Sequence, residues 1–188
     1  SAFCLALNNE IDVAHGKKTL TLLIDIWKCF ELIGPSVLLR EAAAVGYPLR
    51  MAWMLIQAYR QPRTLRAHGS ESRFFVSEQG IVAGCSHATT VLEFLLYRSM
   101  RRLSAICPNV TPHQLVDDTS LRWSGAEAQC AEEVALAADE AQEALTDLRL
   151  PVQVKKLGYV ASDVATERAV QRVTQQRQIA RQRWTVSY

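Results

Sequence analysis

Three aspartates inside apolar segments are the residues of this sequence that most clearly indicate chemistry. Asp117 and Asp118 are adjacent within residues 114–119, and Asp25 lies within the apolar run at residues 22–27. Because carboxylates crowded together in a low-dielectric environment repel one another, they need a cation to neutralise them. Three carboxylates offered by two buried strands suit a pair of Mg²⁺ ions of the kind that assists phosphoryl or nucleotidyl transfer. The pattern therefore predicts a metal-dependent enzyme that acts on phosphates, whereas the competing interpretation of Asp117-Asp118 is an ordinary solvated turn.

The size and composition are those of a globular protein of one domain, or of one domain and part of another. The 188 residues are 49% hydrophobic and 21% charged, with a formal net charge of +2, which allows a substantial core. No apolar run approaches the roughly 20 residues that cross a bilayer. Asn8, Asn9 and Glu10 interrupt the apolar start too early for a signal peptide, and the five cysteines are scattered and odd in number. We therefore expect an intracellular protein, cytoplasmic or nuclear, with reduced thiols and no membrane partner.

Basic side chains gather in two segments. The first, residues 60–73, contains four arginines and His68 with Glu71 as its single acid, and the second, residues 168–183, contains five arginines and no acid. Basic clusters are often only solvated surface, but two of them in a chain with a carboxylate site favour a phosphate backbone as partner. The arginines that we expect to face a nucleic acid are Arg63, Arg66 and Arg73.

Hydrophobic periodicity, glycine and proline predict the elements that must position the aspartates. Helices are predicted at residues 3–16, 35–45, 49–59, 86–103, 126–148 and 163–184. Strands are predicted at residues 19–26, 63–68, 73–77 and 152–160, with one turn at residues 69–72 and a second hairpin around Asp117-Asp118. Ser124 and Glu127 form a predicted capping box at the start of the acidic helix. This order predicts an α+β fold, an antiparallel sheet that bears the acids at one end and is backed by helices.

Four segments, in order and at similar spacing, resemble the palm motifs of reverse transcriptases, and most closely those of the non-long-terminal-repeat retrotransposon and group II intron kind. Residues 25–31 (DIWKCFE) resemble the first motif, D-x-x-K-A-F-D, and residues 79–86 (QGIVAGCS) resemble the second, Q-G-x-P-Q-G-S-P. Residues 115–118 (LVDD) stand where the family has Y/F-A-D-D, and residues 150–160 (LPVQVKKLGYV) resemble the fourth, lysine-bearing motif. The resemblance covers roughly residues 5–162.

The resemblance implies an RNA-directed DNA polymerase. Residues 1–162 would form the palm with part of the fingers, and residues 163–188 would form a basic helix that leads toward a thumb beyond this sequence. Template-directed nucleotidyl transfer would use an RNA or DNA template with a primer, and deoxynucleoside triphosphates. The implied cofactor is a pair of Mg²⁺ ions, with Mn²⁺ as an alternative, and the implied ligands are Asp25, Asp117, Asp118 and the Ile26 carbonyl.

The resemblance also implies residues that bind the substrates. These are Lys28, Phe30, Gln79, Gly80 and Gly84. Phe30 would be the steric gate against a ribose 2′-hydroxyl, although a core aromatic explains it equally well, and Gly80 and Gly84 would let the backbone approach the templating pair. Lys156 would protonate the leaving pyrophosphate, with Lys155 as the rival.

Departures from the family pattern weaken the expectation of activity. Ala83 stands where the second motif usually has glutamine, His87 displaces a proline, Leu115 replaces an aromatic residue and Leu157 replaces a hydroxyl residue. The finger strands that precede the first motif and a thumb are not evident, so we expect a fragment of a longer polyprotein with flanking domains. The alternative is a catalytically decayed, nucleic-acid-binding remnant of a retroelement. A nucleotide cyclase would explain the acids but not Gln79-Gly80 or Lys156.

Overall fold

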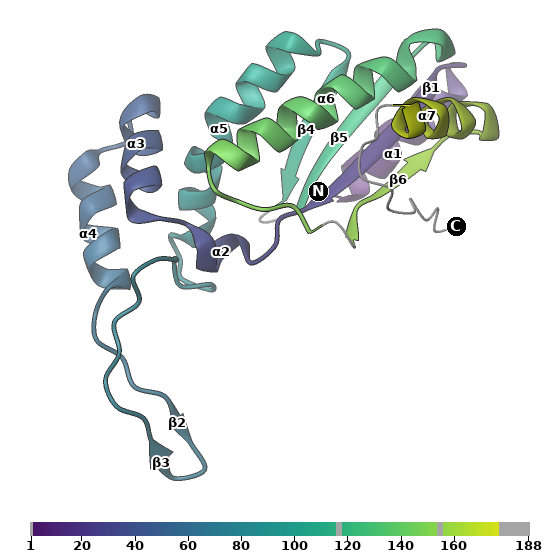
Figure 1. The fold of residues 1–188 in the computed structure, drawn as a ribbon. Helices are drawn as coiled ribbons and strands as arrows, with labels where there is room; N and C mark the ends of the chain where they lie inside the picture. The colour runs from purple at the N-terminus through teal and green to yellow at the C-terminus, as the bar shows by residue number, and fades with distance from the viewer. Residues whose placement is uncertain (1, 116–117, 154–155, 177–188) are drawn as a thin grey trace. The chain divides into compact units, whose positions relative to one another are not determined.

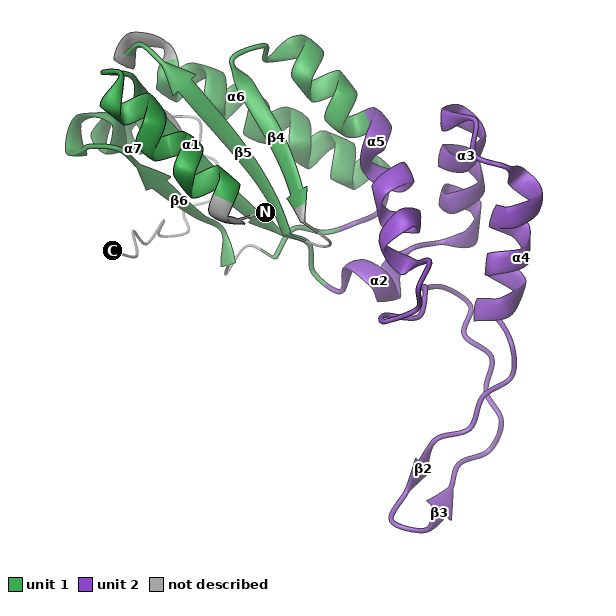
Figure 2. Cartoon of the chain, turned by 180° about the vertical axis from the view of Figure 1, so that it is seen from behind, with its two compact units in different colours: residues 1–27, 99–147, 151–188 green, residues 28–98, 148–150 purple. Residues whose placement is uncertain are grey.

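The structure is a computed structural model that describes residues 2–115, 118–153 and 156–176 (Figure 1). These residues fall into two compact units, coloured separately in Figure 2. Unit 1 takes its described residues from 1–27, 99–147 and 151–188, and unit 2 comprises residues 28–98 and 148–150. The predicted division into residues 1–162 and 163–188 stays a prediction.

Unit 1 is a four-stranded sheet with helices on both faces. Its strands are β1 (Lys18–Asp25), β4 (Val110–Leu115), β5 (Asp118–Gly125) and β6 (Gly158–Ala161), in the order β4-β5-β1-β6, and every neighbouring pair is antiparallel. Its helices are α1 (Ala2–Ala14), α6 (Glu127–Asp147) and α7 (Val164–Gln176). The views from the front and from behind place α6 on one face of the sheet and α1 on the opposite face (Figures 1 and 2). This arrangement confirms the predicted α+β sheet backed by helices.

The face of the sheet under α6 is apolar. Leu20, Leu22 and Ile24 alternate along β1 and are buried, as the period of two in a strand requires. They line a small cavity of about 60 Å³ together with residues of α6 and α7. Trp123 of β5 is also buried, and its indole Nε1 donates a hydrogen bond of 2.7 Å to Glu133 of α6. This packing joins β1 and β5 to α6.

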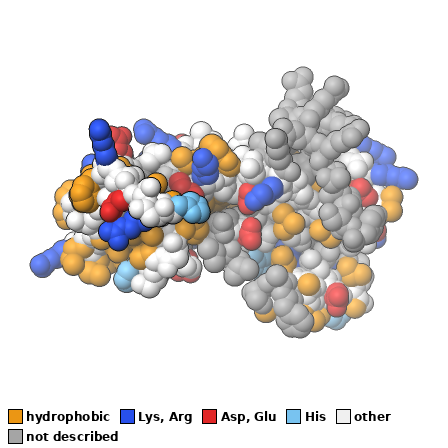
Figure 3. Space-filling view, turned by 90° about the horizontal axis from the view of Figure 1, so that it is seen from below, with side chains coloured by type: hydrophobic (Ala, Val, Ile, Leu, Met, Phe, Trp, Pro, Cys, Tyr) orange, Lys and Arg blue, Asp and Glu red, His pale blue; other side chains and the backbone are white. Residues whose placement is uncertain are grey.

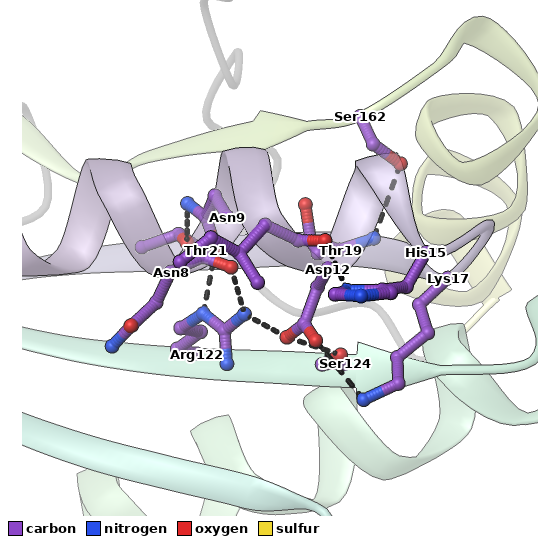
Figure 4. Close-up of polar contacts among 11 residues, drawn as sticks. Asn8, Asn9, Asp12, His15, Lys17, Thr19, Thr21, Arg122, Ser124 and Ser162 are labelled. Carbon is purple, nitrogen blue, oxygen red and sulfur yellow. Dashed lines mark hydrogen bonds and ion pairs between the residues drawn. The ribbon is translucent and has the colours of Figure 1, made fainter.

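The opposite face of the sheet is polar, and α1 covers part of it through one partly buried network (Figure 4). The Arg122 guanidinium donates to Asn9 Oδ1 at 2.7 Å and forms an ion pair with the Asp12 carboxylate. Ser124 Oγ donates to Asp12 at 2.8 Å, and Lys17 Nζ lies 3.0 Å from the same carboxylate. The Arg122 guanidinium is the main cause that holds the pKa of Asp12 well below its usual range.

The network corrects one prediction. Ser124 belongs to β5, its hydroxyl donates to Asp12, and α6 begins only at Glu127. The predicted capping box of Ser124 and Glu127 is therefore wrong. A cap of the expected kind is found instead at α7, where Asp163 Oδ1 accepts hydrogen bonds from the backbone amides of Ala165 and Thr166.

Unit 2 contains helices and a small hairpin. Its elements are α2 (Cys29–Leu32), α3 (Pro35–Val45), α4 (Leu49–Tyr59), β2 (Arg66–Ala67), β3 (Ser70–Glu71) and the first part of α5 (Ala88–Ile106), whose residues from 99 onward belong to unit 1. Its core consists of apolar side chains on α3, α4 and α5, including Leu38, Ile56 and Leu92. Tyr47 stacks on Phe94 with the ring centroids 4.5 Å apart. None of the described helices is long and apolar enough to cross a membrane.

The hairpin of unit 2 is shorter than predicted, and its turn lies elsewhere. The strands occupy residues 66–67 and 70–71, whereas the sequence predicted strands at 63–68 and 73–77. The two turn residues are His68 and Gly69, with φ of 49° and 81°, which fits the type I′ turn that suits two-residue hairpins. The predicted turn at residues 69–72 is wrong because it overlooked histidine as a residue that can adopt positive φ.

Candidate functional site

Two of the three predicted aspartates lie opposite each other on neighbouring strands. Asp25 is the last residue of β1, Asp118 is the first residue of β5, and the antiparallel register pairs them directly. Directly paired residues place their side chains on the same face of the sheet, with Cβ atoms about 4.5–5.5 Å apart. Asp117, the third predicted aspartate, lies outside the described residues.

Lys156 lies against the Asp25 carboxylate. Its Nζ is 3.2 Å from Oδ2 and 3.3 Å from Oδ1 of Asp25. The segment that precedes it follows the end of β1, because Gln153 N donates to Asp25 O at 2.7 Å and Trp27 N donates to Pro151 O at 2.9 Å. These backbone hydrogen bonds position Lys156 beside Asp25, while the rival Lys155 lies outside the described residues.

Ile26 follows Asp25 and forms an isolated antiparallel bridge with Val152. Its side chain is buried. The bridge extends the contact between β1 and the segment that carries Lys156. The predicted role of the Ile26 carbonyl as a metal ligand stays a prediction.

The two aspartates and Lys156 line a pocket of about 410 Å³. The other lining residues are Leu5, Leu23, Ile24, His113, Gln114, Thr119 and Ser120. His113 of β4 pairs with Ser120 of β5, so it lies on the same face of the sheet as Asp25 and Asp118. Burial is the main cause that lowers the pKa of His113, which favours a neutral imidazole at pH 7. The four motifs do not include His113, so it was not predicted as a residue of the site. The alternation of side chains along β4 could have indicated it, because His113 lies two positions before Leu115 and therefore on the same face of the strand as Leu115.

The donor set of this pocket fits a magnesium ion. Within the described parts of the chain, no group of three or more His, Cys, Asp and Glu side chains is placed to hold a metal ion. Mg²⁺, however, is commonly held by one or two carboxylates and completes its shell with water and substrate phosphates. Asp25 and Asp118 supply two such carboxylates on one face, although the Lys156 ammonium competes with a metal ion for the Asp25 carboxylate. Asp25 and Asp118 therefore suit one Mg²⁺ ion, and the predicted pair of ions stays a prediction.

The predicted substrate-binding residues belong to unit 2, where the second-motif loop contacts α2. Gly80 N donates to Ile33 O and Ile81 N donates to Phe30 O, both at 2.8 Å. Gly80 has φ of 90°, and a Cβ at this position would lie 2.8 Å from the Glu31 carbonyl oxygen. A glycine is therefore required here by the packing of the loop against α2 as well as by its conformation.

The remaining predicted substrate residues surround this loop. Gly84 also has positive φ, but a Cβ there would meet open space. Lys28 adopts the left-handed conformation before α2 and is exposed, Gln79 is exposed, and Phe30 is half-buried. Their contacts with a nucleotide or template stay predictions.

The three predicted nucleic-acid-binding arginines differ in their surroundings. Arg63 donates to the Tyr59 carbonyl, and Arg66 Nε lies 3.3 Å from Glu71 Oε1. Arg73 is exposed. Their contact with a nucleic acid also stays a prediction.

Comparisons with known proteins give the fold a class. No protein-family model matches the chain, and no curated protein matches it in sequence. Apo telomerase from Candida tropicalis, truncated from its C-terminal domain, has a similar structure, with a TM-score of 0.62 and 12% identity over 84% of this chain and 34% of that one. Telomerase of the same organism in complex with a TWJ fragment of telomeric RNA gives a TM-score of 0.58 and 12% identity over 85% of this chain and 29% of that one.

At 12% identity, these similarities show that the chain has the fold of part of these telomerase structures. The chain spans about a third of the length of the telomerase chains that it matches. The predicted assignment to the non-long-terminal-repeat or group II intron kind stays a prediction.

Proposed function

We propose that this chain is the palm, with part of the fingers, of an RNA-directed DNA polymerase encoded by a retroelement. The observation that carries the proposal is the direct pairing of Asp25 with Asp118, together with the ion pair between Lys156 and Asp25. The strand pairing and the ion pair together bring residues from three of the four motifs into one pocket. The similarity of the fold to telomerase structures supports the same function, and the four motifs follow one another along the sequence in the order that the family has.

The side chains of the pocket have complementary roles in this reaction. Asp25, Asp118 and Asp117 would hold two Mg²⁺ ions. When bound, these ions stabilise the charge on the transferred phosphate and favour ionisation of the attacking hydroxyl. The Lys156 ammonium holds a proton at Nζ and can give it to a leaving oxygen of pyrophosphate. His113, as a neutral imidazole on the same face, can donate or accept one hydrogen bond without adding charge to the pocket.

The proposed substrates are a primer on an RNA or DNA template and deoxynucleoside triphosphates. The telomerase that was solved with a fragment of telomeric RNA supports a nucleic acid as the partner of this fold. Arg63, Arg66 and Arg73 supply positive charge on unit 2 for such a partner. A longer polyprotein would supply the remaining fingers and the thumb.

Primer extension tests the proposal. The chain is joined to the fingers and thumb of a known polymerase, and the parent is compared with Ala83→Gln and Asp117→Asn. Because one lost hydrogen bond to a polar or charged ligand group costs about 1.5–3 kcal/mol, Ala83→Gln should raise efficiency about ten- to a hundredfold. Asp117→Asn should abolish extension by removing a metal ligand. Extension that does not depend on the template would contradict the proposal that the chain is a template-directed polymerase, and it would favour another kind of nucleotidyl transferase.

The second candidate function is a nucleic-acid-binding remnant that no longer catalyses. Ala83 favours it, because the family pattern has glutamine at this position. In the same experiment, the remnant would bind primer and template normally while the parent, Ala83→Gln and Asp117→Asn all fail to extend. Extension by the parent chain would exclude it, whereas extension by Ala83→Gln alone would show that the palm is competent and that position 83 causes the loss.

A further inference from the structure

The hairpin of unit 2, residues 63–76, exposes large apolar side chains to solvent. The Phe74 side chain is 79% exposed and Leu65 is 67% exposed, and Phe75 and Val76 are also exposed. In the view from below, hydrophobic and basic side chains lie intermixed over the end of unit 2 that carries this hairpin (Figure 3). Contiguous exposed apolar groups of this kind mark sites where another molecule binds.

The hairpin carries a local irregularity at Phe74. Near the turn, Arg66 pairs with Glu71, and Ser72 N donates to Leu65 O at 2.9 Å. Further along, Arg63 pairs with Phe75. Between these points Arg73 and Phe74 both oppose Thr64, so the second strand carries one extra residue. Such a β-bulge redirects a side chain away from the regular alternation.

The bulge sits in a ribbon whose conformation is well specified. The His68-Gly69 turn has positive φ at both residues, which matches the twist of the two strands. Thr64 Oγ1 donates to Glu71 Oε1 at 2.7 Å, which connects the strands through their side chains. These contacts link the two strands near the turn of the hairpin that presents Phe74.

The charge of the hairpin region selects the partner. Residues 60–76 contain four arginines and one glutamate, and Arg73 adjoins Phe74 in the bulge. A basic surface with an exposed aromatic ring suits unpaired nucleotides, because every base has a flat face for stacking and every phosphate a negative charge. An apolar groove of a protein would match Phe74 but would supply no negative charge for the exposed Arg73 beside it.

We propose that the hairpin of residues 63–76 binds single-stranded nucleic acid, with Phe74 stacking on an unpaired base and Arg73 contacting a phosphate. This site lies in unit 2 and needs neither the aspartates nor a metal ion. It holds equally for an active polymerase and for a remnant without catalysis.

The test measures binding of the 188-residue chain to a fluorescent single-stranded oligonucleotide by anisotropy at several salt concentrations. Phe74→Ala should weaken binding about tenfold or more and leave the salt dependence unchanged, because stacking releases no counterions. Arg73→Gln should flatten the dependence of log affinity on log salt. Val76→Ala is the matched control, an exposed aliphatic residue of the same hairpin, and should bind like the parent.

An abasic oligonucleotide separates stacking from every other role of Phe74. On this probe, the parent and Phe74→Ala should bind equally. Because Phe74 is exposed, the variant should keep the circular dichroism spectrum of the parent. Equal binding of Phe74→Ala and the parent to the normal oligonucleotide would overturn the proposal, as would no binding by the parent. A parent that self-associates through Phe74 would instead assign the hairpin to a protein interface.

Discussion

The ion pair between Asp12 and Arg122 should be the polar interaction that most stabilises unit 1. Asp12→Asn keeps the shape of the side chain but removes its charge. Arg122 is only 8% exposed, and the variant leaves its guanidinium with Asn9 Oδ1 and the Asn8 carbonyl as neutral partners. Removing one member of a fully buried pair costs about 3–5 kcal/mol, and this pair is partly buried because the Asp12 side chain is 17% exposed. Because Arg122 keeps two hydrogen bonds, we expect the lower end, about 3 kcal/mol.

Urea unfolding followed by circular dichroism at pH 7 measures this loss. For a chain of this size, about 3 kcal/mol corresponds to a melting temperature lower by roughly 6–12 °C. Lys17→Met is the matched control, because Lys17 contacts the same carboxylate but its side chain is 55% exposed. An exposed ion pair contributes at most about 1 kcal/mol. The reasoning is refuted if Asp12→Asn costs no more than Lys17→Met.

The same variant should change the response to acid. The guanidinium of Arg122 lowers the pKa of Asp12 in the folded chain, so the unfolded chain binds a proton more readily. The stability that Asp12 provides is therefore present above about pH 4 and is lost as the pH falls below it. The difference in unfolding free energy between the parent and Asp12→Asn should shrink below pH 4. A difference that is constant from pH 7 to pH 3 would contradict this cause.

Three further predictions concern glycine, histidine and tryptophan. Gly80→Ala should destabilise the chain more than Gly84→Ala in urea unfolding. Gly80 and Gly84 both have positive φ, but only a Cβ at position 80 would lie 2.8 Å from a backbone carbonyl oxygen. Equal losses of unfolding free energy would show that the backbone conformation alone matters. The pKa of His113 is lowered in the folded chain, so the free energy of unfolding should fall as the pH drops below about 6.5. His113→Gln should reduce this loss between about pH 7.5 and 5.5. An unchanged loss in the variant would exclude His113 as its source. Trp123→Phe removes the hydrogen bond to Glu133 and should cost about 2–3 kcal/mol; a cost below 1 kcal/mol in urea unfolding would show that the bond contributes little.

Much of the fold could be predicted because its elements have strong local signals. The alternation of Leu20, Leu22 and Ile24 defines β1, and Gly46 and Pro48 separate α3 from α4 as predicted. The position of Asp25 at the end of a strand follows from the same pattern. That Asp118 lies beside it depends on the register of two distant strands, so the apolar flanks of the aspartates and the resemblance to reverse transcriptases indicated only that these residues act together.

Other features could not be predicted, because they depend on contacts between distant residues. The polar residues Asn9 and Asp12 of α1 have the pattern of a solvated helix face, yet they meet Arg122 over the sheet. The bulge at Arg73 and Phe74 depends on the register of the hairpin. The four-residue helix α2 is too short to give a periodic signal.

Binding of Mn²⁺ tests the central claim most directly, because Mn²⁺ replaces Mg²⁺ and its electron paramagnetic resonance signal reports the free ion. The chain is titrated in the presence of a deoxynucleoside triphosphate. Asp25→Asn and Asp118→Asn should each weaken binding at least about tenfold, since fewer ligand charges lower the affinity, and Glu71→Gln should not. Lys156→Met should tighten binding, because it removes a positive charge that lies 3.2 Å from Asp25. If Asp25→Asn and Asp118→Asn bind Mn²⁺ like the parent, the two aspartates do not form the predicted metal site.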